Sequence, residues 1–496
     1  MPSRIKRACS NLVNDPQRLW TIGLAALPNL ILFFALPPIW NYIDSYVTLN
    51  TTLDLIPHHP PVYPYLAKIM RETFGGVNDA SVWAMIVFQH VLAVWSVYYL
   101  VTAFESLAIR GWLVSIGAVA ASFHVYSHGI FTEGVAGPLL FFVVGAMLRV
   151  ALVGPNRHNI QAYYLAALFC VLTRHALAVL LMGLPVLLVL VGSLTRNLYV
   201  YRQRFIWAVV AGLLVLIVSS LVTRTACFFI GTDPTSILGR AGVYRMQSLD
   251  WSGLKPQEKE ALIAAVESRL SGPIERAAVR IMIEEPNPWA GPYLAIERLL
   301  KEKGQKQNVD EVMNAVYSAF LRTAGAPLIH RILADAAGYY GPFNFRFYPE
   351  ASAVQSVQAY QRDDHMKKVM GRLSVVQHVD LDRYRNLGRL MDFLPLDRVA
   401  GWHLVILTLG LLVLGLAAGL LPAGQSALII TLLITSAVYA LFNSLATITI
   451  WRYVSPTQAL VVLSFGLAIA FMISNFTAAR TAAGDNRSGS GRPERG

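Results

Sequence analysis

Long apolar runs separated by short polar segments dominate the pattern of this chain. Runs of about 20 residues, the length with which a helix crosses ~30 Å of hydrocarbon, recur along the sequence. They fall near 20–42, 82–104, 111–129, 133–153, 160–173, 176–194, 205–229, 400–421, 427–448 and 456–477. The pattern predicts an all-α polytopic membrane protein with about ten transmembrane helices. The run at 160–173 is short, and the region 160–194 also admits another division into spans.

A different kind of sequence separates the seventh run from the eighth. Residues 231–398 hold 20 of the 29 acidic residues, and the segment 255–270 shows apolar positions at helical spacing with charge on its other face. We therefore predict a mostly helical extracytoplasmic domain at 231–398. The expected organisation is an N-terminal transmembrane module (1–230, with a first outer loop at 44–80), this domain, a C-terminal transmembrane module (399–477) and a disordered Gly/Ser/Arg-rich cytoplasmic tail (478–496).

Composition and charge agree with a membrane protein. The 496 residues are 55% hydrophobic and 14% charged, whereas soluble domains carry about 25% charged residues. The net charge of +12 comes from basic residues at the ends of apolar spans, not on one amphipathic face, so we expect no nucleic-acid partner. The side with more Lys and Arg is cytoplasmic by the positive-inside rule. This predicts both termini in the cytoplasm of a multi-pass membrane protein with a retained first helix.

Three acidic residues are expected at the outer face. Asp44 and Asp54 follow the outward exit of the first span, and Glu133 begins the fourth span at the same face. An acid at the edge of the membrane is costly and is therefore a functional candidate. For Asp44 the helix dipole adds to that cost, whereas it favours Glu133 at a helix start. The structural alternatives are a hydrated helix end for Asp44, a turn for Asp54 and a favourable helix-start charge for Glu133.

The segment HHPPVYP in the first outer loop combines titratable and rigid residues. His58 or His59, with His59 favoured, is a candidate general base, metal ligand or hydrogen-bond donor to a phosphate. The alternative is a solvated loop histidine. The two prolines predict a PPII-like turn. Beyond Tyr63, the amphipathic run 64–74 predicts an interfacial helix with Lys68 and Arg71 toward the headgroups.

Basic residues occur in two other short loops that are expected at the outer face. Arg452, followed by Tyr453, lies between the last two spans, where a guanidinium suits a phosphate or pyrophosphate headgroup. The alternative is an interfacial arginine in an aromatic belt. Arg174 and His175 repeat this pattern more weakly between the fifth and sixth spans, and His128 precedes Glu133 by about a turn.

Taken in order, these motifs resemble the C-type membrane glycosyltransferases (GT-C), in particular the bacterial relatives of dolichyl-phosphate-mannose protein mannosyltransferases. The matching pieces are Asp44-Ser45-Tyr46, His59-Pro60-Pro61-Val62-Tyr63-Pro64, Thr132-Glu133-Gly134-Val135 and Arg452-Tyr453-Val454-Ser455-Pro456. The resemblance covers roughly the first 150 and the last 50 residues. The chain departs from the family in lacking an Asp-Glu doublet in the first loop, and 231–398 matches no known pattern.

The resemblance implies an inverting transfer of a sugar from a polyprenyl-phosphate donor to an acceptor hydroxyl at the extracytoplasmic face of a bacterial inner membrane. Asp44 would be the general base, and Arg452 would stabilise the leaving lipid phosphate. Glu133 and His59 would position the sugar, the acceptor or a divalent metal ion, with Asp44 and Glu133 as its ligands. Whether a metal takes part is open. Tyr63, His128 and Tyr453 complete the expected substrate-binding set, and membrane lipids are the surrounding partner.

Two other function classes compete with an enzyme. A transporter or flippase for a lipid-linked or anionic substrate should show paired broken spans in two related halves, and the Gly and Pro breaks here are not symmetric. A catalytically silent relative would disperse Asp44, Glu133 and Arg452, whereas an enzyme would gather them.

Overall fold

The computed structural model describes most of the chain, with gaps. The described residues are 16–39, 60–103, 127–130, 132–152, 156–174, 177–178, 198–229, 238–249, 255–285, 291–341, 354, 358, 367, 373, 380–392, 401–446 and 451–489. For some helical residues near these gaps, including 451–455 and 482–489, only the backbone is described.

The described chain is almost entirely α-helical, as the sequence predicts. Its first half contains α2 (Pro16–Ala35), α4 (Val62–Thr73), α5 (Asp79–Val101), α8 (Glu133–Leu152), α9 (Arg157–Thr173) and α11 (Leu198–Phe229). The middle contains α12 (Leu238–Gln247), α13 (Pro256–Glu267), α14 (Pro273–Glu284), α15 (Gly291–Glu302), α16 (Val309–Thr323), α17 (Gly325–Gly338) and α21 (Leu381–Asp392). The last part contains α22 (Gly401–Ala417), α23 (Ala423–Ala446) and α24 (Trp451–Gly489). No strand is assigned within these ranges, and the β-type pairing there is a single bridge between Ile39 and Gly129.

Five of the described helices contain segments long and apolar enough to cross a membrane. These segments are Asp79–Val101, Glu133–Val150, Gly212–Phe229, Ala423–Leu445 and Pro456–Thr481, and Leu19–Ala35 and Gly401–Ala417 are shorter apolar helices. Two predicted spans, 111–129 and 176–194, lie almost wholly outside the described residues. The structure therefore confirms a helical protein with several apolar helices, and the number of about ten spans stays a prediction.

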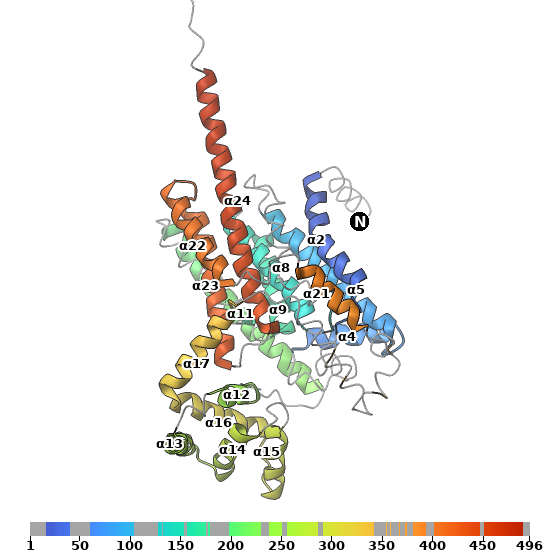
Figure 1. Ribbon diagram of the computed structural model, residues 1–496, viewed down its shortest axis with the longest axis vertical. Helices are drawn as coiled ribbons and strands as arrows, with labels where there is room; N and C mark the ends of the chain where they lie inside the picture. Colours follow the sequence, from blue (N-terminus) through green and yellow to red (C-terminus); the bar gives the residue numbers. More distant parts are fainter. Residues whose placement is uncertain are drawn as a thin grey trace, which may run out of the picture.

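The apolar helices form one bundle. Helix α8 packs against α5, α9 and the start of α24, α2 packs against α5, and α23 and α24 pack against each other. The exposed large apolar side chains lie mainly on these helices, for example Phe34, Trp95 and Val413, as expected for surfaces that face lipid. In Figure 1 the start of α2 and the far end of α24 lie at one end of the bundle, and α12–α16 lie at the other.

Helices α12–α17 share a hydrophobic core of their own, with Val279, Met282 and Phe320 fully buried in it. Helix α12 approaches α16 very closely, because a Cβ on Gly242 would lie 2.4 Å from the ring of Tyr317. This group of helices contacts the membrane bundle at the end of α23, where Arg245 donates a hydrogen bond to the carbonyl oxygen of Ser444. Arg245 also pairs with Asp335 of α17. The proposed domain boundaries around this group stay predictions.

Two local expectations differ from the structure. Pro61 has helical backbone angles (φ −71°, ψ −25°) and precedes α4 directly, so a PPII conformation does not continue through it. Proline is tolerated in a first helical turn because the N–H it lacks has no partner there. Helix α24 extends to Gly489, so residues 478–489, expected to be disordered, are helical. Their alanines favour a helix.

Candidate active site

Glu133 lies at the first residue of α8 and is 3% exposed. Its Oε2 accepts a hydrogen bond of 3.0 Å from the hydroxyl of Thr132. A carboxylate is favoured in a first helical turn because the helix dipole is positive there. That position explains why the helix begins here, but not why the side chain is buried.

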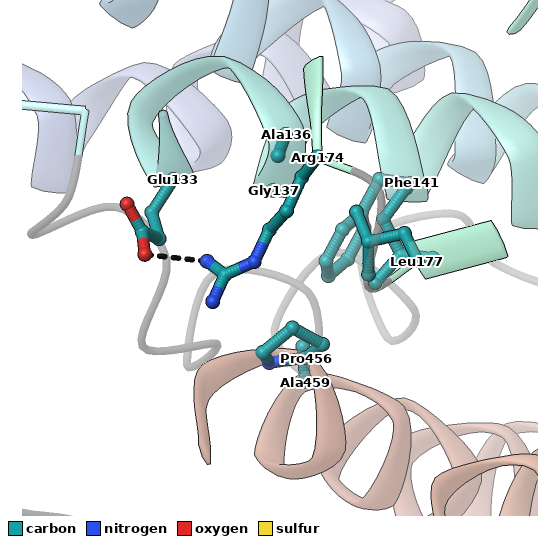
Figure 2. A pocket seen from close by; sticks show the side chains of 9 residues that line it. Glu133, Ala136, Gly137, Phe141, Arg174, Leu177, Pro456 and Ala459 are labelled. Atoms are coloured by element: carbon teal, nitrogen blue, oxygen red, sulfur yellow. Dashed lines mark hydrogen bonds and ion pairs between the residues drawn. The ribbon is translucent and has the colours of Figure 1, made fainter. Parts of the chain in front are cut away.

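Arg174 is the buried partner of this carboxylate. It follows the last residue of α9 in an extended conformation (φ −154°, ψ 107°), which turns the chain away from the helix. Its Nη1 donates to Oε1 of Glu133, and the two side chains are 9% and 3% exposed. Figure 2 shows the guanidinium directed at the carboxylate. The ion pair therefore joins the end of α9 to the start of α8.

A small cavity borders the ion pair. Its walls come from α8 (Glu133, Ala136, Gly137, Leu140, Phe141), from Arg174 and Leu177, and from α24 (Pro456, Ala459). The space open to the centre of a water-sized sphere is about 10 Å³, which is room for about one water molecule. The early turns of α24 thus face the ion pair across this cavity (Figure 2).

Arg452 and Tyr453 lie in the first turn of α24, and their backbone is helical. Pro456, one turn further along, lines the cavity. The described backbone therefore places the late Arg-Tyr-x-x-Pro motif close to the Glu133–Arg174 pair. The positions of the Arg452 and Tyr453 side chains lie outside the described part of the structure.

The exit of α2 is hydrogen-bonded to the segment that leads into Glu133. The N–H of Ile39 donates to the carbonyl oxygen of His128 (2.8 Å), and the N–H of Ile130 donates to that of Ile39 (3.2 Å). Asp44 follows Ile39 by five residues, which span at most about 17 Å of extended chain. The described chain after α2 thus ends, at Ile39, beside the segment that leads into α8. Asp44, Asp54, His58 and His59 lie outside the described residues.

Gln89 of α5 connects the proline motif with the same segment. Its Oε1 accepts from the hydroxyl of Tyr63 (3.3 Å). Its Nε2 donates to the carbonyl oxygens of Gly129 (2.9 Å) and Ser127 (3.3 Å). Burial, and secondarily the charge of Glu133, raise the pKa of the Tyr63 hydroxyl well above its usual value. Tyr63 therefore stays protonated and donates to Gln89.

His128 is fully buried, and both of its ring nitrogens have partners within the protein. Nδ1 lies 2.9 Å from Nε2 of His90, and Nε2 lies 2.9 Å from the carbonyl oxygen of Leu36. Tyr63 and His128, both predicted to bind substrate, line neither of the two cavities described in this section. In this structure they hold the framework around Glu133.

A large apolar groove lies beside the ion pair, on another face of α8. Its volume is about 710 Å³. Its walls come from α4 (Pro61, Val62, Tyr65, Leu66, Ile69), α5 (Phe88, Leu92), α8 (Val135, Leu139), α9 (Phe169, Leu172) and α11 (Leu221, Val222, Thr225, Ala226, Phe229). A helix is thus present where the sequence predicts one, as α4, and it forms one wall of this groove. Its place at the membrane interface stays a prediction.

No group of three or more His, Cys, Asp or Glu side chains in the described residues could hold a metal ion. Because Asp44 lies outside them, the pairing of Asp44 with Glu133 at a metal stays a prediction.

Sequence reasoning gave little weight to Arg174 and none to Gln89. The signal for Arg174 was a basic residue directly after a short predicted span, at the expected outer face. For Gln89 it was a polar amide in the middle of an apolar run, which has to find hydrogen-bond partners inside the bundle.

Comparison with known proteins gives similarity at the level of structure. No protein-family model matches the sequence, and a search of curated proteins finds no match. Among solved structures, the chain is similar to ArnT from Cupriavidus metallidurans bound to undecaprenyl phosphate, with 14% identity and a TM-score of 0.33. For the apo state of the same protein the values are 16% and 0.32, and both matches cover 90% of this chain and 77% of the other. Similarity this low assigns no function to this chain.

Proposed function

We propose that this protein is a membrane glycosyltransferase that moves a sugar from a polyprenyl-phosphate donor to an acceptor hydroxyl at the extracytoplasmic face, with inversion. The observation that carries the proposal is the buried Glu133–Arg174 pair beside the 710 Å³ apolar groove. A phosphate on a polyprenyl chain needs a cationic site and an apolar site next to each other, and both adjoin the start of α8.

The groove suits the hydrocarbon part of such a donor. Fourteen of its 16 lining residues are apolar, the others being Tyr65 and Thr225, and its volume is within the usual range of about 300–1,000 Å³ for ligand sites. Helix α4, with Tyr63 and Ala67 buried and the Lys68–Glu72 pair more exposed, lies as an amphipathic helix would at a membrane surface. A lipid tail in the groove would place its phosphate near that surface.

Arg174 would bind the donor phosphate. A guanidinium pairs with phosphate oxygens in a planar, bidentate geometry, and Arg174 borders the cavity that α24 closes. Helices α8 and α24 both begin at this place, and helix starts favour anions. Arg452, in the first turn of α24, would add a second cation and stabilise the lipid phosphate as its charge develops. Since the cavity has room for only about one water molecule, substrate would have to displace the neighbouring segments.

Asp44 would be the general base that takes the proton of the acceptor hydroxyl. His59, or a divalent metal held by Asp44 and Glu133, would help to position the sugar or the acceptor. Glu133 holds the guanidinium of Arg174 in place and keeps it charged. Tyr63 and His128 would support this arrangement through Gln89 and His90. Tyr453 would lie next to Arg452, in the first turn of α24.

The test is sugar transfer by the full-length protein in lipid nanodiscs, with a panel of undecaprenyl-phosphate sugars and mass spectrometry of products. We expect Asp44→Asn and Arg174→Gln to abolish transfer, and Arg174→Gln also to weaken binding of undecaprenyl phosphate. Glu297→Gln, which alters an exposed ion pair with Lys301 on α15, is the matched control and should transfer normally. Movement of intact lipid-linked sugar across a vesicle membrane without any transferred product would overturn the proposal in favour of a flippase.

A further inference from the structure

A buried chain of hydrogen-bonding side chains runs from α2 through α5 to the segment 127–130. The carbonyl oxygen of Leu36 lies 2.9 Å from Nε2 of His128, and Nδ1 of His128 lies 2.9 Å from Nε2 of His90. Nδ1 of His90 then lies 2.7 Å from Oδ1 of Asn29. The Nδ2 of Asn29 donates to the carbonyl oxygen of Ala25 at 2.8 Å.

The hydrogen bonds of this chain need one more ring proton than two neutral imidazoles carry. The Leu36 oxygen is only an acceptor, so Nε2 of His128 must be protonated. The contact between the two rings needs a second proton, on Nδ1 of His128 or on Nε2 of His90. The contact of Nδ1 of His90 with Oδ1 of Asn29, at 2.7 Å, needs a third, because two acceptors would otherwise lie in contact. Three contacts require three protons, and two neutral rings supply two.

Turning the Asn29 amide over does not remove the conflict. Its nitrogen would then donate to Nδ1 of His90, but its oxygen would face the carbonyl oxygen of Ala25 at the 2.8 Å now spanned by a hydrogen bond. The chain is satisfied at both ends when the two rings together carry three protons.

We propose that His90 and His128 form a binding site for one proton, held between Asn29 and the carbonyl oxygen of Leu36. The two rings share this proton across the 2.9 Å contact between them. This proposal does not rest on the proposed glycosyl transfer. Its consequence is structural: with the proton bound, the segment that leads into Glu133 is fixed against the end of α2, next to the Ile39 bridge.

Aromatic side chains lie around the pair. The rings of Phe33 and Trp83 lie with centroids 5.9–6.2 Å from the imidazoles, a distance at which an aromatic ring can attract a cation. Helix α2 has no titratable residue between Leu19 and Ala35, and 36–39 has none either.

Among the described residues, titratable groups near this region come from α4, α5, α8 and α21. On α4, Tyr63 donates to Gln89, and Lys68 pairs with Glu72. On α5, Asp79 lies at the first residue of the helix, three turns before His90. On α8, Glu133 pairs with Arg174. On α21, the hydroxyl of Tyr384 donates to the carbonyl oxygens of Pro37 and Pro38, at 3.1 and 3.2 Å. A carboxylate in place of Asn29 should hold the bound proton more tightly, because it adds a counter-charge at Nδ1 of His90.

The experiment is ¹⁵N NMR of the full-length protein in nanodiscs, with all 11 histidines labelled in the ring. At about pH 8, well above the ordinary histidine pKa of about 6.5, a solvated ring is neutral. We expect one histidine with both nitrogens protonated. His90→Gln and Asn29→Leu should remove this signal, because the second removes the acceptor that requires the third proton.

Two further variants make the result specific. Asn29→Asp, which keeps the shape and adds a counter-charge, should retain the signal to higher pH than the wild type. His403→Gln, on the exposed side of α22, should leave it unchanged. All histidines neutral at pH 8 in the wild type would overturn the proposal, and so would a doubly protonated ring that persists in Asn29→Leu. If Asn29→Leu does not fold, the wild-type spectrum and the upward shift in Asn29→Asp decide the question.

Discussion

Removing either partner of the Glu133–Arg174 pair should destabilise the protein far more than removing both. The two side chains are 3% and 9% exposed, so each charge is largely out of water. At an effective dielectric constant of ~20 and a contact of about 3–4 Å, their attraction is about 4–6 kcal/mol. The desolvation of each ion costs several kcal/mol, so the pair contributes little net stability. A single substitution, however, leaves the other ion desolvated and unpaired.

We therefore expect Glu133→Met and Arg174→Met each to lower the free energy of unfolding by about 3–5 kcal/mol. The double substitution should lie within about 2 kcal/mol of the wild type, since two apolar side chains of similar size replace the pair. The assay is denaturant unfolding in detergent micelles, followed by tryptophan fluorescence, with the free energy taken from the midpoint and slope.

The control is the exposed pair Glu297–Lys301, whose side chains are 38% and 73% exposed. Glu297→Gln should cost less than about 1 kcal/mol. If the Glu133 and Arg174 variants cost no more than this control, or if their costs simply add in the double variant, the buried ion pair is refuted. A stable double variant that no longer transfers sugar would, in contrast, separate the role of the pair in function from its role in stability.

Three pairs of substitutions test the hydrogen bonds of Gln89, the contact of α12 with α16 and the apolar groove. Gln89→Leu removes the donor to the carbonyl oxygens of Ser127 and Gly129 and should cost about 2–4 kcal/mol in thermal unfolding, whereas Tyr63→Phe, which removes one hydroxyl, should cost about 1 kcal/mol. Gly242→Ala should cost about 1–3 kcal/mol, because its Cβ would meet the Tyr317 ring; Gly410→Ala, with open space at its Cβ, should be neutral or slightly stabilising. Val222→Trp should fill the groove and lower the amount of co-purified polyprenyl phosphate measured by mass spectrometry several-fold. Val210→Trp, at an equally exposed position of α11 outside the groove, should leave it unchanged.

Hydrophobic periodicity predicted the helices well because it depends only on neighbouring residues. Eight of the predicted apolar spans coincide with described helices, and the amphipathic segment 64–74 appears as α4, Val62–Thr73. The boundaries shifted by a few residues where turn chemistry decides them, as at Pro61. The tail differed because composition alone does not reveal that a preceding helix can continue into an alanine-rich segment.

The partners of the site residues were harder to predict than the residues themselves. Glu133 was identified by its position at a span start, but its partner Arg174 is 41 residues away, and nothing local in the sequence links the two. The same holds for His128, which was expected to bind substrate. Its burial results from the approach of α2 and α5, and a sequence pattern does not report which helices become neighbours.

The burial of the Glu133–Arg174 pair at the start of α8 bears on function, because stability alone does not account for it. A bundle that needed only stability would be better served by apolar side chains at positions 133 and 174, because a buried ion pair contributes little net stability. Here the pair coincides with two helix starts, with the early turns of α24 and with an apolar groove. Gln89 and His90 fix the adjoining segment from neighbouring positions of one helix. A costly charged group held by a dedicated hydrogen-bonded framework is what a preorganised anion site requires, and this argues that Arg174 is retained for its charge.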